Sequence, residues 1–246
     1  MPSDLVLANR LLANRGVVDS FGHVSMRHPD RPDRYLLSRS RAPYLVVDAD
    51  IMEFTLENEP VSHDERALYA GRAIHARIYA ARPDVAAICH NHAPATIPFG
   101  VTCTDLRPIF HMAWAIGASI PIWDIADRFG DTNVLVTKNE MGDHLAHMLG
   151  SHRVARMRVH GSVVTGATLR EDVFTAVYRQ ANAESLTAAI GLGPVRSLND
   201  GEIDAASRTL FEPLSHNRAW ENWAAQIALD AEKRNCGRYR DVRRRN

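Results

Sequence analysis

The chain has 246 residues, of which 46% are hydrophobic, and its 29 lysines and arginines equal its 29 aspartates and glutamates. A chain of this size can bury a substantial core, and no Pro-, Gly- or Ser-rich linker divides it, so we expect a single domain over residues 1–232. Because the formal net charge is zero, no overall field attracts nucleic acid or an anionic membrane. The expected partner is a small molecule.

Cysteine content and the N-terminal sequence suggest the cellular compartment. Cys89, Cys103 and Cys236 are too few for a disulfide framework. The first residues contain no long apolar run typical of a signal peptide, and no stretch of about 18 apolar residues is present for a membrane span. The sequence therefore predicts a cytoplasmic protein with no membrane partner.

The N-terminal third begins with a helix and a hairpin. Leu5 and Leu12 belong to an apolar set at helical spacing, and Gly16 can close that helix in the left-handed conformation. Residues 21–38 contain two short β-like runs around a turn rich in Pro and Asp, which predicts a β-hairpin.

A loop with two arginines follows the hairpin. Ser38, Arg39, Ser40 and Arg41 place two guanidinium groups beside two hydroxyl groups. Guanidinium presents a fixed set of donors that suits carboxylate or phosphate, so these four residues are candidates for binding an anionic substrate. The alternative is an ordinary solvated turn.

Two histidines one residue apart form the strongest local pattern. A helix is predicted from His63 to Ala81, then a strand from Val85 to Cys89, and His90 and His92 come directly after that strand. Residues i and i+2 of an extended segment point to the same side, so two neutral imidazoles can share one cation. Since the chain has 12 histidines, a chance pair is the alternative.

The apolar pattern predicts further elements downstream: a strand at 120–124, a helix at 139–150, a strand-turn-strand unit at 156–166, and helices at 169–186, 202–210 and 219–231. His160 falls at the break inside the strand-turn-strand unit. The basic segment 233–246 is expected to be a flexible tail, and apart from Tyr239 it lacks the interleaved aromatic residues that would favour nucleic-acid binding.

The order of these motifs resembles the class II aldolase/adducin family, from GHVSMR at position 22 through the helix ending near residue 188. The resemblance implies an α/β fold, with a central, mostly antiparallel sheet between helices in three layers (α/β/α). It also implies a C4-type homotetramer with active sites between neighbouring subunits. A divalent cation is implied on His90, His92 and His160.

Three departures from the aldolase pattern point to one branch of the family. Gly71 stands where aldolases have a glutamate that serves as ligand or base, and residues 38–41 replace the usual phosphate-binding loop. His23 stands where asparagine is often found. With these changes the chain looks most like the decarboxylases of hydroxy-aromatic dicarboxylates, such as 3,4-dihydroxyphthalate or the hydroxypyridine dicarboxylate of vitamin B6 breakdown.

That resemblance implies a metal-dependent carboxy-lyase of aromatic catabolism. Manganese is favoured, zinc also suits three imidazoles, and the metal would hold the electron pair left when CO2 departs. Arg39 or Arg41 would hold the carboxylate that stays. His111 is the preferred proton donor, with His23 and Tyr178 as the other candidates, although both His111 and Tyr178 also have a purely packing interpretation.

Other functions remain open at this point. A sugar-phosphate aldolase or epimerase of the same family would need another residue in place of the glutamate. A non-catalytic, adducin-like interaction module would bind no metal. An iron-dependent oxygenase on the same scaffold is a third alternative, and His75, which lies on the Gly71 side of its helix, is a further candidate for the site.

Overall fold

The computed structural model describes residues 2–62, 65–210 and 213–243. Its strands are β1 (His23–Arg27), β2 (Arg34–Ser38), β3 (Ile51–Thr55), β4 (Ala87–Asn91), β5 (Ile122–Trp123), β6 (Val154–Met157) and β7 (Gly161–Gly166). Its α-helices are α1 (Pro2–Asn14), α2 (Ala73–Ala81), α3 (Pro98–Val101), α4 (Ala126–Phe129), α5 (Asn139–Leu149), α6 (Leu169–Leu192), α7 (Asp200–Leu210) and α8 (Pro213–Arg243).

One sheet organises these elements, with the strand order β3-β2-β1-β4-β7-β6-β5. Every neighbouring pair is antiparallel except β5 and β6, which run parallel. The predicted mostly antiparallel sheet is therefore confirmed. Its register places His23 of β1 opposite His90 of β4, and Asn91 opposite Ser162 of β7.

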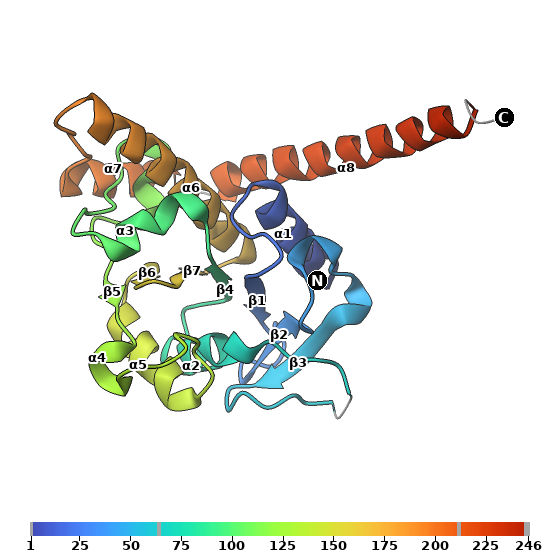
Figure 1. Ribbon diagram of the computed structural model, residues 1–246, viewed down its shortest axis with the longest axis horizontal. Coiled ribbons are helices and arrows are strands. Elements are labelled where there is room, and N and C mark those ends of the chain that lie inside the picture. Colours follow the sequence, from blue (N-terminus) through green and yellow to red (C-terminus); the bar gives the residue numbers. More distant parts are fainter. Residues whose placement is uncertain (1, 63–64, 211–212, 244–246) are drawn as a thin grey trace.

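Helices cover both faces of the sheet (Figure 1). On one face, α2 and α5 pack on a cluster that includes Ile74, Ile88 and Val163. On the other, α1 and α6 pack on a cluster that includes Cys89 and Val164. Consecutive strand residues such as Ile88 and Cys89 enter opposite clusters, as the alternation of side chains along a strand requires. The predicted three-layer α/β/α arrangement is confirmed.

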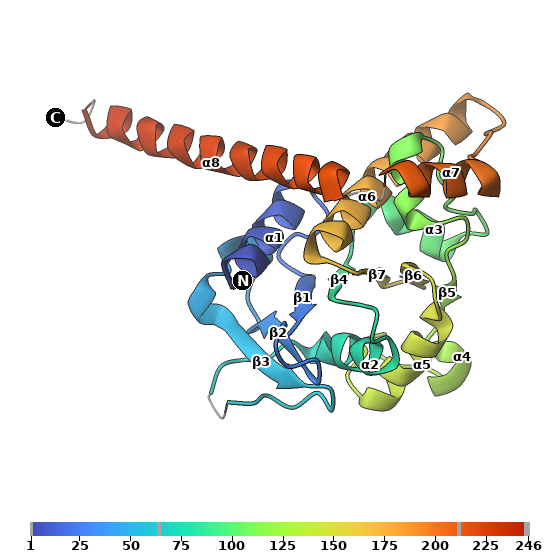
Figure 2. The same ribbon diagram turned by 180° about the vertical axis from the view of Figure 1, so that it is seen from behind.

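The C-terminal helix α8 extends away from the rest of the chain, which both views show (Figures 1 and 2). Its first turns contact the body, where Trp220 and Trp223 are buried. The backbone continues as helix to Arg243, where the sequence predicts a flexible tail from residue 233; residues 244–246 lie outside the described part. Within the described ranges, no helix is long and apolar enough to cross a membrane.

Two predicted boundaries differ from the structure. The helix expected from residue 63 begins only at Ala73, after a 3-10 turn, and positions 63–64 lie outside the described residues. Residues 65–69 are instead held beside the arginine loop, because the Ala67 carbonyl accepts from the Ser40 amide at 2.7 Å. The strand carrying the histidine pair also runs further than predicted, so His90 lies inside β4.

Candidate metal centre and its surroundings

Strands β4 and β7 bring three histidines together at one edge of their pairing. His90 is the penultimate residue of β4, His92 follows its end, and His160 directly precedes β7. One ring nitrogen of each lies within 4.8 Å of the others. Because Asn91 pairs with Ser162, the end of β4 and the start of β7 coincide, and the structure brings the three candidate metal ligands together.

Gly161 allows the two segments to approach this closely. A Cβ at this position would lie 2.3 Å from the Asn91 carbonyl oxygen and 2.9 Å from Cδ2 of His92. Both separations are shorter than van der Waals contact, so only glycine fits without a backbone shift. The glycine after His160 is thus required for the close packing of the three histidines.

Burial keeps the three imidazoles neutral. It lowers the pKa of His90 well below its usual value and also lowers that of His92. Burial, and then the nearby His92, lower the pKa of His160 to about 4. The Nδ1–H of His90 donates to the Ser162 carbonyl at 3.1 Å, so the lone pair of His90 is on Nε2. Three neutral imidazoles, with the lone pair of His90 held in this way, fit a divalent cation.

We expect the metal-free protein to lose stability as pH falls below about 6.5, the usual value for histidine. Burial lowers the pKa of His75 to about 3, so between about pH 6.5 and about pH 3 the unfolded chain binds a proton that the folded chain does not. The stability contribution is complete above the unfolded pKa and is lost by about 1.4 kcal/mol per pH unit as pH falls. Urea unfolding in EDTA at pH 7, 6 and 5 measures this dependence of the free energy of unfolding on pH.

His75→Gln should reduce the pH dependence by about 1.4 kcal/mol per pH unit. The control His147→Ala, which removes an exposed histidine, should leave the pH dependence unchanged. Equal pH dependence in the wild-type protein and both variants would contradict the expectation.

A chain of four hydrogen-bonded side chains adjoins the three histidines. His23 Nδ1 lies 2.6 Å from His75 Nε2, and His75 Nδ1 lies 2.6 Å from Ser25 Oγ. Ser25 Oγ in turn lies 2.9 Å from the Tyr79 hydroxyl. The His23 ring is centred 5.0 Å from that of His90, so the chain leads from α2 to the edge of the metal centre. Sequence reasoning placed His23 and His75 near the site but did not connect them.

His23 faces the position where aldolases have their glutamate. A Cβ on Gly71 would lie 3.3 Å from His23 Nε2 and 3.7 Å from its Cε1. This separation is tighter than ordinary packing, so a larger side chain at position 71 would press on the imidazole ring. The two positions at which the sequence differs from the aldolase pattern, His23 and Gly71, therefore lie directly against each other.

The arginine loop is already paired with an internal carboxylate. Arg39 Nε lies 2.6 Å from Asp50 Oδ1 and Arg41 Nη1 lies 2.8 Å from Asp50 Oδ2. Burial raises the Asp50 pKa, but bonds from Arg39 and the Val47 amide and the charge of Arg41 outweigh it, and the net pKa is lowered. Both candidate anion-binding arginines are therefore already paired within the chain, and the cluster of Arg39, Arg41 and Asp50 holds two cations and one anion, which leaves one net positive charge.

Tyr69 connects this loop to the histidines, and sequence reasoning missed it. Its hydroxyl donates to the Arg41 carbonyl and lies 3.5 Å from Ser38 Oγ, while its ring is centred 4.5 Å from that of His23. Ser38 is buried beside it, whereas the Ser40 side chain is exposed. The signal available in the sequence was an aromatic residue two positions before Gly71.

His111 and Tyr178 lie elsewhere. They line a separate pocket of about 610 Å³ together with residues of α8, among them Arg218 and Trp223. Tyr178 packs against Phe174, with ring centres 4.5 Å apart. Within the described part of this chain, neither residue contacts the three histidines, because α6 and the segment 111–116 cover the opposite face of the sheet. The packing interpretation accounts for Tyr178, and no contact in this chain supports His111 as proton donor.

Asn91, between His90 and His92, anchors the two histidines from the other face of the sheet. Its Oδ1 accepts from the buried Arg179 of α6 and, at 3.3 Å, from Ser162 Oγ. Burial lowers the pKa of Arg179 to about 10, which leaves the guanidinium charged at neutral pH. A buried cation thus fixes the backbone between His90 and His92. The signal in the sequence was an arginine three residues after Ala176, on the inward face of the predicted helix.

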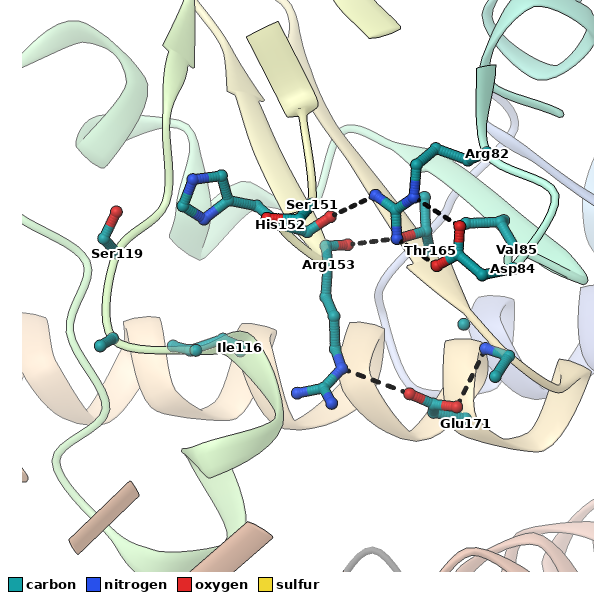
Figure 3. A pocket seen from close by; sticks show the side chains of 14 residues that line it. Arg82, Asp84, Val85, Ile116, Ser119, Ser151, His152, Arg153, Thr165 and Glu171 are labelled. Carbon is teal, nitrogen blue, oxygen red and sulfur yellow. Dashed lines mark hydrogen bonds and ion pairs between the residues drawn. The ribbon is translucent and has the colours of Figure 1, made fainter. Parts of the chain in front are cut away.

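A second polar pocket, of about 500 Å³, lies at the far end of the same strands (Figure 3). It includes Arg82, Arg153 and Glu171, and it adjoins Gly166, which pairs with Ala87 at the start of β4. The three candidate metal-binding histidines lie at the opposite end of β4, so they are separated from this pocket by the length of that strand.

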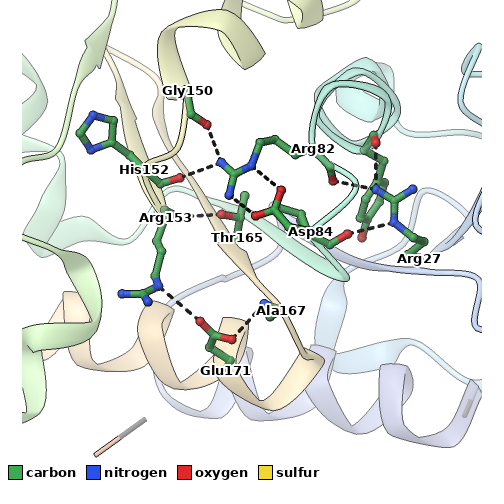
Figure 4. Close-up of polar contacts among 11 residues, drawn as sticks. Arg27, Arg82, Asp84, Gly150, His152, Arg153, Thr165, Ala167 and Glu171 are labelled. Atoms are coloured by element: carbon green, nitrogen blue, oxygen red, sulfur yellow. Dashed lines mark hydrogen bonds and ion pairs between the residues drawn. The ribbon is translucent and has the colours of Figure 1, made fainter. Parts of the chain in front are cut away.

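The charges of this second pocket pair with one another (Figure 4). Arg82 binds both oxygens of Asp84, at 2.7 and 2.6 Å, and donates to the Gly150 and His152 carbonyls. Arg153 Nε lies 3.4 Å from Glu171. These contacts tie the α2–β4 connection to the segment before β6, so the pocket's polar groups act in holding the fold together.

The mostly antiparallel sheet between two helical layers, with one buried and two partly buried histidines at one strand edge, defines an α/β protein with a candidate divalent-metal centre. Residues 3–186 match the family described as class II aldolase and adducin N-terminal domain. The chain belongs to the class II aldolase and adducin family.

Individual relatives refine this comparison. Decarboxylase tropJ of Talaromyces stipitatus is 29% identical over 239 residues, covering 88% of this chain and 90% of that protein. The 3,4-dihydroxyphthalate decarboxylase of Arthrobacter keyseri is 25% identical over 242 residues, covering 91% and 92%. Among solved structures, L-fuculose 1-phosphate aldolase from Glaciozyma antarctica PI12 has a TM-score of 0.77 at 20% identity, covering 94% of this chain and 90% of that one, which shows the shared fold.

Proposed function

We propose that this protein is a divalent-metal-dependent decarboxylase that removes a carboxylate next to a ring hydroxyl from a hydroxy-aromatic or hydroxypyridine dicarboxylate. The observation that carries the proposal is the composition of the centre: three neutral imidazoles, with Gly71 and His23 Nε2 in the place of the aldolase glutamate. The two relatives named as decarboxylases support it.

His90, His92 and His160 would hold the cation. When bound, a divalent cation stabilises negative charge that develops on a substrate oxygen. Ligand type alone admits manganese and zinc, and manganese is the preferred choice because an oxygen-rich aromatic substrate favours it. A metal centre without a carboxylate ligand leaves positions for a substrate that supplies its own oxygen atoms.

The other residues have separate roles in this proposal. The net positive charge of Arg39, Arg41 and Asp50 favours an anion, and Tyr69 connects that loop to His23. Arg39 or Arg41 would hold the carboxylate that remains on the ring. His23 is the preferred group to contact the substrate beside the metal, in place of His111, because it lies next to His90. The protein is expected to act as a homotetramer in the cytoplasm.

A substrate screen tests the proposal. Purified protein is loaded with Mn2+ or Zn2+ and incubated with 3,4-dihydroxyphthalate and 3-hydroxy-2-methylpyridine-4,5-dicarboxylate, and CO2 release is measured. We expect release from at least one of them. Cleavage or epimerisation of fuculose, rhamnulose or ribulose phosphates without CO2 release from any aromatic acid would favour an aldolase or epimerase, and absence of bound metal would favour an adducin-like interaction module.

Arg39→Ala should raise KM for a dicarboxylate by about tenfold while changing kcat little, because a charged hydrogen bond to the retained carboxylate acts in binding. A monocarboxylate analogue should show little change in KM. Arg31→Ala is the matched control, since Arg31 binds Glu53 in a comparable surface ion pair away from the histidines. Equal KM changes for both substrate classes would argue against an anion-binding role for Arg39.

A further inference from the structure

The four-membered hydrogen-bond chain beside the metal centre has only one direction that satisfies all its members. Tyr79 is buried, with 1% of its surface exposed, and its hydroxyl bonds Ser25 Oγ. Within the described ranges, no other partner of this hydroxyl is present. A buried hydroxyl that donated to nothing would be left with an unsatisfied proton, which is unfavourable by about 1–3 kcal/mol. Tyr79 therefore donates to Ser25.

This choice fixes every proton along the chain. Ser25 is also fully buried, and among the described residues the other printed partner of its hydroxyl is His75 Nδ1, 2.6 Å away, so Ser25 donates its single proton there rather than leaving it unsatisfied. His75 is fully buried, and its neutral ring then carries its proton on Nε2. That proton is donated to His23 Nδ1, also 2.6 Å away. His23, accepting on Nδ1, must carry its own proton on Nε2.

The far end of the chain reaches the metal centre. His23 Nε2 faces Gly71, at 3.3 Å from where a Cβ would be, and the His23 ring lies 5.0 Å from that of His90. The glutamate of the aldolases would present acceptor oxygens in this place. Here the same place presents an N–H group, which can only donate.

We propose that Tyr79, Ser25 and His75 are positioning residues that lock His23 in its Nε2–H tautomer, so that it donates a hydrogen bond to an oxygen of a substrate held at the three-histidine centre. The proposal rests on the proposed function for the substrate, whereas the tautomer itself is a property of the protein alone. It explains why position 71 is glycine: the donor and a larger side chain cannot share the space. It also gives the site a preference for substrates with an anionic oxygen at this point.

The tautomer can be measured without any substrate. The full chain, labelled with 15N-histidine and loaded with diamagnetic Zn2+, is analysed by NMR, and the His23 signals are assigned by their loss in His23→Asn. We expect a protonated Nε2 and an unprotonated Nδ1. A protonated Nδ1 in the wild-type protein would overturn the proposal.

Two tyrosine variants test the direction of the chain. Tyr79→Phe removes the terminal donor, while Tyr35→Phe removes the hydroxyl of a neighbouring buried tyrosine whose ring is centred 5.5 Å away and which bonds the Arg72 carbonyl instead. We expect the Nδ1–H form of His23 to appear only in Tyr79→Phe, with kcat/KM for 3,4-dihydroxyphthalate lowered about tenfold. If the two variants have the same His23 tautomer and the same activity, Tyr79 does not set the direction of the hydrogen bonds along the chain.

A second pair of variants covers the case in which Tyr79→Phe fails to fold. Ser25→Ala interrupts the chain next to His75, and Ser25→Thr restores the hydroxyl. In Ser25→Ala we expect a mixture of the Nδ1–H and Nε2–H forms of His23, and in Ser25→Thr we expect the Nε2–H form alone. If His23 in Ser25→Ala stays entirely in the Nε2–H form, the proposal that the hydrogen-bond chain sets the tautomer is overturned. If no aromatic acid is decarboxylated by the wild-type protein, the proposed function fails while these tautomer measurements still decide the inference.

Discussion

His92→Ala should abolish stoichiometric metal binding and lower decarboxylation by about a thousandfold. Metal-assisted stabilisation of developing charge contributes several kcal/mol to catalysis, and about 4 kcal/mol corresponds to three orders of magnitude. His92 is suited to this test because it lies beyond the end of β4 and is only partly buried, so its removal perturbs the sheet less than that of His90. Metal content by mass spectrometry and CO2 release are the two measurements.

His147→Ala is the control for the metal prediction. His147 is an exposed histidine on α5, outside the three-histidine group, and its loss should leave metal content and activity unchanged. A metal that binds the folded state alone also raises Tm, so EDTA should lower the Tm of the wild-type and His147→Ala proteins and leave that of His92→Ala unaffected. Unchanged metal content in His92→Ala would contradict the assignment of the centre.

Gly161→Ala should destabilise the fold by about 3 kcal/mol and weaken metal binding by about tenfold to a hundredfold. The added Cβ would lie 2.3 Å from the Asn91 carbonyl oxygen, so β4 or β7 must shift. The same atom would lie 2.9 Å from Cδ2 of His92, so the shift reaches a proposed metal ligand directly. Urea unfolding of the metal-free protein and zinc titration measure the two effects separately.

Gly191→Ala provides a control of opposite sign. Gly191 lies in α6, and a Cβ there meets nothing within 4 Å, so alanine should stabilise the helix by about 0.5–1 kcal/mol. Metal affinity should stay the same. If Gly161→Ala were as stable as the wild-type protein and bound zinc equally well, the close approach of β4 and β7 would not be what positions the centre.

Local patterns in the sequence were sufficient to identify much of the centre. The alternation of side chains along a strand put His90 and His92 on one side, and the break before Gly161 put His160 at a strand edge. These inferences need only the backbone periodicity of neighbouring residues. The resemblance to a known family then implied a central, mostly antiparallel sheet between helices, which the structure confirms.

Contacts between distant segments were not accessible in the same way. The pairing of Arg39 and Arg41 with Asp50 depends on a short 3-10 turn that brings Asp50 back to the loop, and the sequence indicated no partner within the chain for either arginine. His111 was preferred as proton donor on residue type, but α6 and its neighbours lie on the opposite face of the sheet from the histidines. Residue type alone does not specify the face of a sheet on which a distant segment packs.

At positions 23 and 71 the sequence and the tertiary structure each determined a different part of the site. The sequence by itself determined that an acid is absent at Gly71 and that a histidine stands at position 23, since both are read directly from the motifs. Only the tertiary structure decided that these two changes fill one space and that His23 is bonded through His75 and Ser25 to Tyr79, across sequence separations of 50 to 54 residues. The physical reason is register: β1 pairs with β4 so that His23 lies opposite His90, and α2 packs over that pair. Register follows from how the whole sheet buries its two faces, which no short segment specifies.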